Sequence, residues 1–136
     1  SIQVIEHVAD PVGFLRDAGR LLRKDSGRLF ITTPNRRDFL MKALPDIYPA
    51  FFYRRAHRWY FDNASLARCA AKAGLKVEVT GALQRYGLSN TLLWMRDGRP
   101  SGGAVLPGID EGADSYWKTY LEQSGTAEML FMTFRP

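Results

Sequence analysis

The 136-residue sequence is poor in cysteine and has no long apolar run. Its single cysteine, Cys69, excludes an internal disulfide and fits a reducing compartment, so we expect a cytoplasmic protein. No apolar run approaches the ~20 residues that a membrane-spanning helix needs, and no signal peptide is visible. The first residue, Ser1, is not Met and opens an apolar segment, which leads us to expect further chain upstream.

The composition is that of one folded domain, residues 1–136, with 46% hydrophobic and 24% charged residues. The net charge is +5, from 19 basic and 14 acidic side chains. Part of this excess is local, because five arginines flank an aromatic stretch. An arginine-rich solvated surface is the simpler interpretation, and an anionic partner such as nucleic acid is the alternative. The five are Arg36, Arg37, Arg54, Arg55 and Arg58.

Apolar spacing and stop signals predict alternating helices and strands. Asp10 and Pro11 begin a helix over 11–23, and a buried parallel strand over 28–33 follows. Residues 36–61 carry two aromatic triplets and are predicted to be a lid or substrate-facing insertion. The remaining predictions are helices at 37–44, from 62 or 63 to 72, and 110–124, strands at 75–80 and 129–134, an apolar segment at 86–95, and a loop at 97–112.

Four local strings occur in a characteristic order: residues 4–11 (VIEHVADP), 21–29 (LLRKDSGRL), 32–35 (TTPN) and 73–75 (AGL). Together they resemble the second half of a class I S-adenosylmethionine-dependent methyltransferase, in the branch of the ubiquinone-biosynthesis O-methyltransferases. Each string alone is weak, but four in the right order and spacing form a strong signal. The resemblance covers residues 1 to about 86 closely and the remainder loosely.

The resemblance implies an α/β chain with a partial Rossmann-like fold, which lacks the N-terminal strands and carries a C-terminal antiparallel strand. It also implies S-adenosyl-L-methionine as cofactor. In such enzymes the glycine-rich loop and the ribose-binding acid precede the point where this chain begins. Only Ser1, Ile2 and Gln3 are expected to line the methionine end of the cofactor site.

Glu6 and His7 follow a strand end, where ligands bind in open α/β sheets. Because histidine titrates near neutrality, His7 is our candidate for the general base, with Glu6 orienting it or the substrate. The alternative is structural: Glu6 caps a turn and His7 bonds to the backbone.

Some relatives carry Glu-x-x-Glu-His and a later histidine as ligands of a divalent metal. Here the corresponding residues are Gln3, Glu6, His7 and His57, and Gln3 replaces an anionic ligand with a neutral one. We therefore expect no metal, and place His57 with the substrate-binding residues.

Three further residues are candidates for contact with the acceptor: Asn35 at a strand end, and Tyr86 and Asn90 in a glycine-containing turn. The alternative for each is turn or core packing. The expected function is methyl transfer to an oxygen of a small-molecule acceptor. The alternatives are a nucleic-acid acceptor and a noncatalytic remnant that serves as an interaction module.

Overall fold

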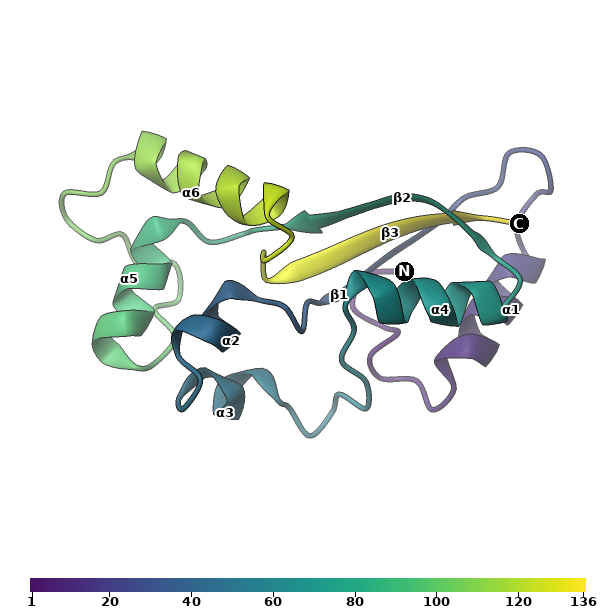
Figure 1. Ribbon diagram of the computed structural model, residues 1–136, viewed down its shortest axis with the longest axis horizontal. Helices are drawn as coiled ribbons and strands as arrows, with labels where there is room; N and C mark the ends of the chain where they lie inside the picture. Colours follow the sequence, from purple (N-terminus) through teal and green to yellow (C-terminus); the bar gives the residue numbers. More distant parts are fainter.

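A computed structural model describes all residues 1–136 as a mixed α/β chain (Figure 1). None of its helices combines the length and apolar character that crossing a membrane requires. The helices are α1 (Pro11–Arg20), α2 (Phe39–Ala43), α3 (Tyr48–Phe52), α4 (Asn63–Lys72), α5 (Leu88–Asp97) and α6 (Glu111–Gln123), and the strands are β1 (Leu29–Pro34), β2 (Lys76–Leu83) and β3 (Met129–Arg135).

The three strands form one sheet in the order β1-β3-β2, and both pairings are antiparallel. The prediction of a C-terminal antiparallel strand is thus confirmed. The prediction that the strand near 28–33 is parallel is wrong for its main pairing, because β3 returns between β1 and β2 and takes the hydrogen bonds of both. Parallel contact is limited to isolated bridges, of Ile2 with Thr32 and of Asn35 with Phe61.

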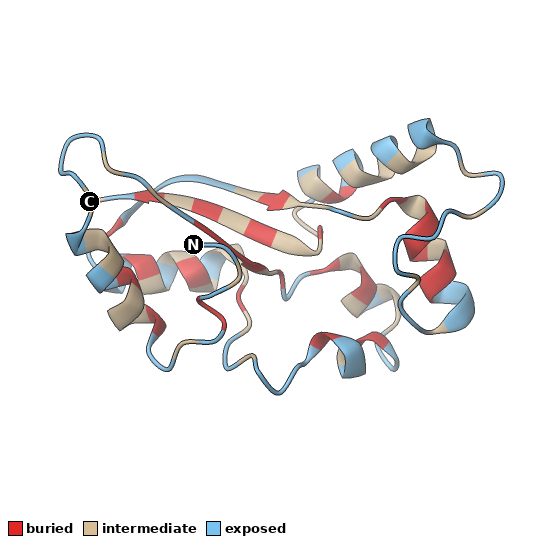
Figure 2. Cartoon of the chain, turned by 180° about the vertical axis from the view of Figure 1, so that it is seen from behind, coloured by how far each residue is buried: buried red, intermediate tan, exposed pale blue.

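One face of the sheet is covered by α1 and α4, which also pack on each other (Figure 1). Alternate residues of β3, Leu130, Met132 and Phe134, are buried against this layer, as the banding of the strand in Figure 2 shows. The same core takes in Ile5 and Leu15. Burial of these side chains is the main driving force for docking the helices on the sheet.

The opposite face of the sheet is partly open. Phe30 and Val79 are 42% and 49% exposed, and the Phe30 ring lies 5.7 Å from that of Phe131. Phe131 also lies across Gly81, where an added Cβ would stand 2.5 Å from the ring. Glycine is therefore required in β2 at this cross-strand position.

The helices differ from the predictions in several places: α2 is shorter than the predicted 37–44, α5 forms where only an apolar segment was predicted, and α1 and α3 differ most. Helix α1 starts at Pro11 with Asp10 as its cap, as predicted, but ends at Arg20, and Leu21 after it is 88% exposed. Leu21 therefore has no core contact to extend the helix. Helix α3, between Tyr48 and Phe52, was not predicted, and Pro49 occupies its first turn, where proline is tolerated.

The other end of the molecule is formed by α2, α3, α5 and α6. Helix α6 packs on β2 and α5, and α2 packs on α3 (Figure 1). Leu40, Tyr48, Phe52 and Trp94 form a second small core there. The segment 36–61 is thus anchored by this second core, to which α5 contributes Trp94, and at its end by Phe61, which belongs to the main core.

Helix α4 begins with a capping box at Asp62, one of the two positions at which the sequence predicted the helix to start. The Asp62 carboxylate accepts from the Ser65 backbone N–H at 2.8 Å, and the Ser65 hydroxyl accepts from the Asp62 N–H at 2.9 Å. These hydrogen bonds satisfy two backbone donors that the helix itself cannot. The bond from the Ser65 N–H is the main reason why the pKa of Asp62 is lowered.

We predict that Asp62→Ala lowers the free energy of unfolding by about 1 kcal/mol, because the first turn of α4 loses its cap. Asp62→Asn, which keeps the cap, should retain most of that stability near neutral pH. The wild type should lose the ionic part of the cap as the pH falls through the lowered pKa of Asp62, and the asparagine variant should not. Urea denaturation at several pH values measures both effects. Equal stability of the alanine variant and the wild type would contradict the prediction.

Candidate functional site

Two groups of side chains meet at one end of the sheet. The first, which we call the acid–histidine cluster, consists of Glu6, His7 and His57. The second, which we call the aromatic pocket, lies between α2, α3, α5 and the sheet, where β1 and β2 end and β3 begins. His57 belongs to both, because it also lines the pocket. Carboxyl ends of strands are where open α/β sheets bind ligands.

Glu6 is fully buried, and only one of its carboxylate oxygens has a partner. Oε2 accepts a hydrogen bond from the Thr33 hydroxyl at 3.1 Å, and Oε1 has none. The backbone carbonyl of Glu6 accepts from the N–H groups of Arg58 and Trp59, at 2.7 and 3.2 Å. This second contact ties the loop that carries His57 to Glu6.

The His7 ring has a defined orientation. Its Nδ1 lies 2.8 Å from the Ala56 carbonyl, and because a carbonyl can only accept, Nδ1 carries the hydrogen. In the neutral ring Nε2 then presents a lone pair, 3.9 Å from Glu6 Oε1. The Glu6 side chain is buried and the His7 side chain is 42% exposed, so a proton or a cation at Nε2 would compensate the buried carboxylate.

His57 closes the cluster on the pocket side. Its ring lies at 75° to the His7 ring, with centroids 4.8 Å apart, and its buried Nδ1 has no hydrogen-bond partner. Burial is the largest cause lowering the pKa of His57; Glu6 opposes it, while His7 and Arg54 lower the pKa further. A neutral imidazole next to a buried carboxylate can accept a proton from a ligand.

The cluster also has the composition of a cation site. One ligand atom from each of Glu6, His7 and His57 lies within 4.8 Å of the others. The hydrogen bond from His7 Nδ1 to a backbone carbonyl is the outer-shell contact that commonly orients a metal-binding imidazole. A bound cation would also give a partner to Glu6 Oε1, which has no hydrogen bond. These residues fit a divalent metal, although Gln3 adds no charge to the set.

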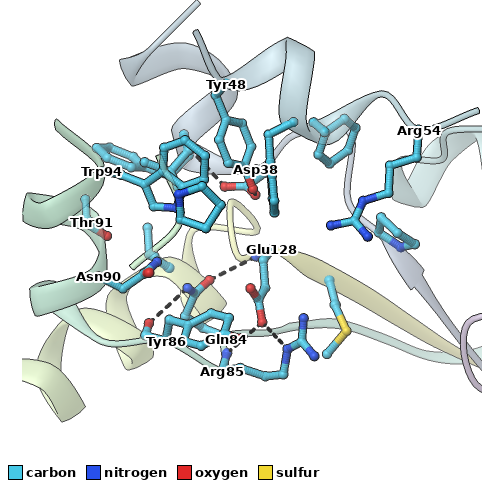
Figure 3. Close-up of a pocket in the computed structure, with 18 of the residues that line it drawn as sticks. Asp38, Tyr48, Arg54, Gln84, Arg85, Tyr86, Asn90, Thr91, Trp94 and Glu128 are labelled. Carbon is cyan, nitrogen blue, oxygen red and sulfur yellow. Dashed lines mark hydrogen bonds and ion pairs between the residues drawn. The ribbon is translucent and has the colours of Figure 1, made fainter. Parts of the chain in front are cut away.

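The aromatic pocket encloses a cavity of about 290 Å³. This volume is close to the lower limit for small-molecule sites. Tyr48, Phe51, Phe52 and Trp94 form its aromatic wall, and Tyr48 and Phe51 both contact Trp94 edge-on at 5.1 Å between centroids. Polar side chains face the cavity from the opposite side, including those of Glu128 and Arg85 (Figure 3).

A hydrogen-bonded network fixes the polar side of the pocket. Glu128 Oε1 accepts from the backbone N–H and the guanidinium of Arg85, at 3.1 and 2.6 Å. The Gln84 side chain accepts from the Glu128 N–H and donates to the Tyr86 carbonyl. Because Arg85 neutralises Glu128, this pair adds no net charge to the cavity.

Asp38 is a buried acid inside the pocket. It caps α2 by accepting from the Leu40 N–H, and its other oxygen accepts from the Tyr48 hydroxyl at 2.7 Å. Burial raises the pKa of Asp38 to about 6, against the two hydrogen bonds, and the charge of Glu128 adds to the rise. Burial and the Asp38 charge raise the pKa of Tyr48 as well.

Of the three residues expected at the cofactor end, Gln3 lies at the pocket and Ser1 and Ile2 do not. Gln3 lines the pocket, contacts the Met129 sulfur with its amide at 3.2 Å, and has a left-handed backbone with φ of 55°. That conformation is unfavourable for a residue with a side chain. Ser1 and Ile2 run beside β1 outside the pocket, and Ile2 is 70% exposed.

Of the three residues predicted to contact the acceptor, two line the pocket and one does not. Tyr86 and Asn90 line the pocket. Asn35 does not: its amide donates to the carbonyls of Gly125 and Ala127, and its side-chain oxygen accepts from the Arg37 N–H. With these bonds made, the side chain is occupied in holding the start of β3.

Sequence reasoning missed most of the polar residues of the pocket, namely Asp38, Tyr48, Gln84, Arg85 and Glu128. Asp38 had a usable signal, since an aspartate before an apolar helical run is a helix cap. Nothing local marked Glu128, which reaches the pocket only because β3 returns through the middle of the sheet.

The raised pKa of Asp38 predicts that stability falls with rising pH. Between its unfolded value of 3.8 and its folded value of about 6, the folded protein retains a proton that the unfolded chain has lost. The free energy of unfolding should therefore decrease across this interval, by roughly 3 kcal/mol. Asp38→Asn should abolish that slope in urea titrations, whereas Asp46→Asn, at an exposed loop position, should preserve it. An unchanged slope in the Asp38 variant would contradict the assignment.

Comparison with known proteins identifies a family for the chain. A family profile described as "Methyltransferase domain" matches residues 1–80, a span that contains the whole acid–histidine cluster and, apart from Trp94, the aromatic wall of the pocket. A search of curated proteins found no match. Because the matched span is more than half of the 136 residues, the chain belongs to the methyltransferase-domain family.

Proposed function

We propose that the protein transfers the methyl group of S-adenosyl-L-methionine to an oxygen of a small-molecule acceptor bound in the aromatic pocket. The observation that carries the proposal is the meeting of the acid–histidine cluster with the pocket at His57. An acceptor in the pocket then lies against a group able to take a proton. The enclosed volume suits a small molecule.

The finer family assignment is part of this proposal. A Rossmann-like class I fold is supported by the order β1, α4, β2, β3, by the antiparallel return of β3, and by the parallel run of residues 1–3 beside β1. The branch of the ubiquinone-biosynthesis O-methyltransferases is supported by the Glu6-His7 pair together with His57.

S-adenosyl-L-methionine supplies, when bound, a methyl group on a positively charged sulfur that a nucleophile displaces in line. The residues present fit the methyl end of such a donor only. Gln3, with its strained backbone, borders the pocket where donor and acceptor must meet. Gly102 and Gly103 lie in the loop between α5 and α6 and form no strand-to-helix turn for a nucleoside.

The chain's own contribution to the reaction is positioning and proton removal. The aromatic wall holds the acceptor and keeps water from its reactive oxygen. We assign the hydroxyl proton to His57, which lines the pocket, in place of His7, the candidate named from the sequence, which does not line it. His7 and Glu6, directly behind His57, orient the imidazole and stabilise the positive charge it acquires. Proton transfer of this kind contributes about 10²–10⁴-fold to a rate.

A divalent metal in the acid–histidine cluster is a second way to use the same residues. Glu6 Oε1, His7 Nε2 and a ring nitrogen of His57 would hold it, and it would lower the pKa of an acceptor hydroxyl. The pairing of Nε2 with an otherwise unpartnered carboxylate oxygen favours this alternative. The neutral amide of Gln3 weighs against it.

The proposal is tested by methyl-transfer assays of the full-length protein with labelled donor and a panel of phenols and alcohols. His57→Ala and Glu6→Gln should lower kcat by about 10²–10⁴-fold with a smaller effect on KM. Glu78→Gln, which removes a carboxylate paired with Arg28 away from the site, is the control and should retain full activity. Full activity of both site variants would remove the proposal.

Three further measurements decide between the alternatives. Full activity in excess chelator would exclude the metal, and loss restored by one divalent ion would establish it. A steep fall of acceptor binding between low and moderate salt would favour nucleic acid, since that interaction releases counterions. Absence of saturable donor binding by the full-length protein would favour a noncatalytic remnant.

A further inference from the structure

The loop between α5 and α6, residues 98–110, borders the aromatic pocket (Figure 1). Pro100 and Gly102 of this loop are among the residues that line the cavity. At Gly103, the next residue, an added Cβ would stand 3.9 Å from the ring of Tyr86, which also lines the cavity. The loop therefore forms part of the cavity wall.

Few interactions hold this loop against the rest of the chain. None of residues 98–110 is buried, and Val105 is 68% exposed. The backbone of residues 99–109 makes two hydrogen bonds, and both stay within the loop. Segments with few buried apolar contacts and no backbone bonds to a neighbouring element open at a small cost in free energy. The loop therefore has the local properties of a segment that can open while the rest of the fold stays intact.

One hydrogen bond ties the loop to the pocket. The Ser101 hydroxyl donates to the side-chain oxygen of Asn90 at 2.7 Å, and no other hydrogen bond joins residues 99–109 to the rest of the chain. Asn90 lies in the first turn of α5, is 9% exposed, and itself lines the cavity (Figure 3). The attachment of the loop is thus made at the wall of the pocket.

The two ends of the loop are glycines with positive φ. Gly98 closes α5 in the left-handed conformation with φ of 63°, and Gly108 has φ of 90°. Glycine adopts these angles without strain and also reaches the ordinary backbone regions, so it can absorb a change of chain direction. A loop that is joined through two such residues can swing without disturbing α5 or α6.

We infer that residues 99–107 form a lid over the aromatic pocket, with Gly98 and Gly108 as hinges and the hydrogen bond from Ser101 to Asn90 as its latch. The inference rests on the proposed function only in taking the pocket for the acceptor site. The acceptor enters while the lid is open, and closure keeps water from the reacting oxygen. Loss of the latch shifts the lid toward its open position.

The test measures how often the lid opens, in the full-length protein and without a ligand. Thr91→Cys places a thiol in the cavity wall, at a position that is 3% exposed, and iodoacetamide alkylates it once the cavity opens. Ser101→Ala should raise the alkylation rate about fivefold, which is the effect of losing one hydrogen bond of ordinary strength. Ser115→Ala is the matched control: it removes an exposed hydroxyl of α6 that makes no hydrogen bond, and should leave the rate unchanged. Peptide mass spectrometry follows the one thiol, so Cys69 does not contribute.

A second thiol separates lid opening from unfolding of the helix. Ser89 lies two residues before Thr91 in α5 and is 2% exposed, but does not line the cavity. The thiol of Ser89→Cys should therefore react slowly with and without Ser101→Ala. A nitroxide attached to Val105→Cys, at an exposed position of the loop, should become more mobile in Ser101→Ala and not in Ser115→Ala. This measurement decides by itself where Thr91→Cys fails to fold.

Equal alkylation of Thr91→Cys with and without Ser101→Ala, a parallel rise at Ser89→Cys, or a nitroxide that Ser101→Ala leaves unchanged would overturn the inference. The proposed function fails separately, because none of these measurements needs a substrate. Latch-dependent opening without methyl transfer to any acceptor contradicts the function and supports the lid. Methyl transfer with opening that does not depend on Ser101 contradicts the lid alone.

Discussion

The buried carboxylate of Glu6 is the constraint on which the site depends. A carboxylate that is fully out of water and has one hydrogen bond is costly to bury unless positive charge compensates it. The same residue accepts two backbone hydrogen bonds from the loop after His57. The buried Glu6 carboxylate therefore favours positive charge nearby. Glu6 also positions the histidines that can supply that charge. The histidine chemistry of the pocket follows from this one arrangement.

In the aromatic pocket beside the cluster, both acidic side chains already have partners. Glu128 is neutralised by Arg85, and Asp38 is occupied by Tyr48 and the start of α2. Arg54 lies over the Phe51 ring and makes no salt bridge. The lining of the pocket comes mainly from α2, α3, α5 and the strand ends, and the acid–histidine cluster contributes only His57.

The regular elements could be predicted wherever the signal is local. Asp10-Pro11 and Asp62 mark helix starts, and both cap their helices in the structure. The resemblance to methyltransferases was also readable, because Glu6-His7 and the strings after it are contiguous. The antiparallel C-terminal strand was expected only from the resemblance, and no local pattern shows that it pairs with β1, about 100 residues earlier. Helix α3 was missed because Pro49 is compatible with both a helix start and a helix stop.

By itself the sequence determined which residues can carry chemistry and where helices begin, because capping and residue type are short-range properties. The tertiary structure decided which of these residues act together. It brought His57 to Glu6 and His7, left Asn35 bound to the backbone before β3, and placed Glu128 opposite Tyr48 in one cavity. The physical reason is that burial and charge pairing depend on what the folded chain places within a few ångströms, and spacing along the sequence does not specify that distance.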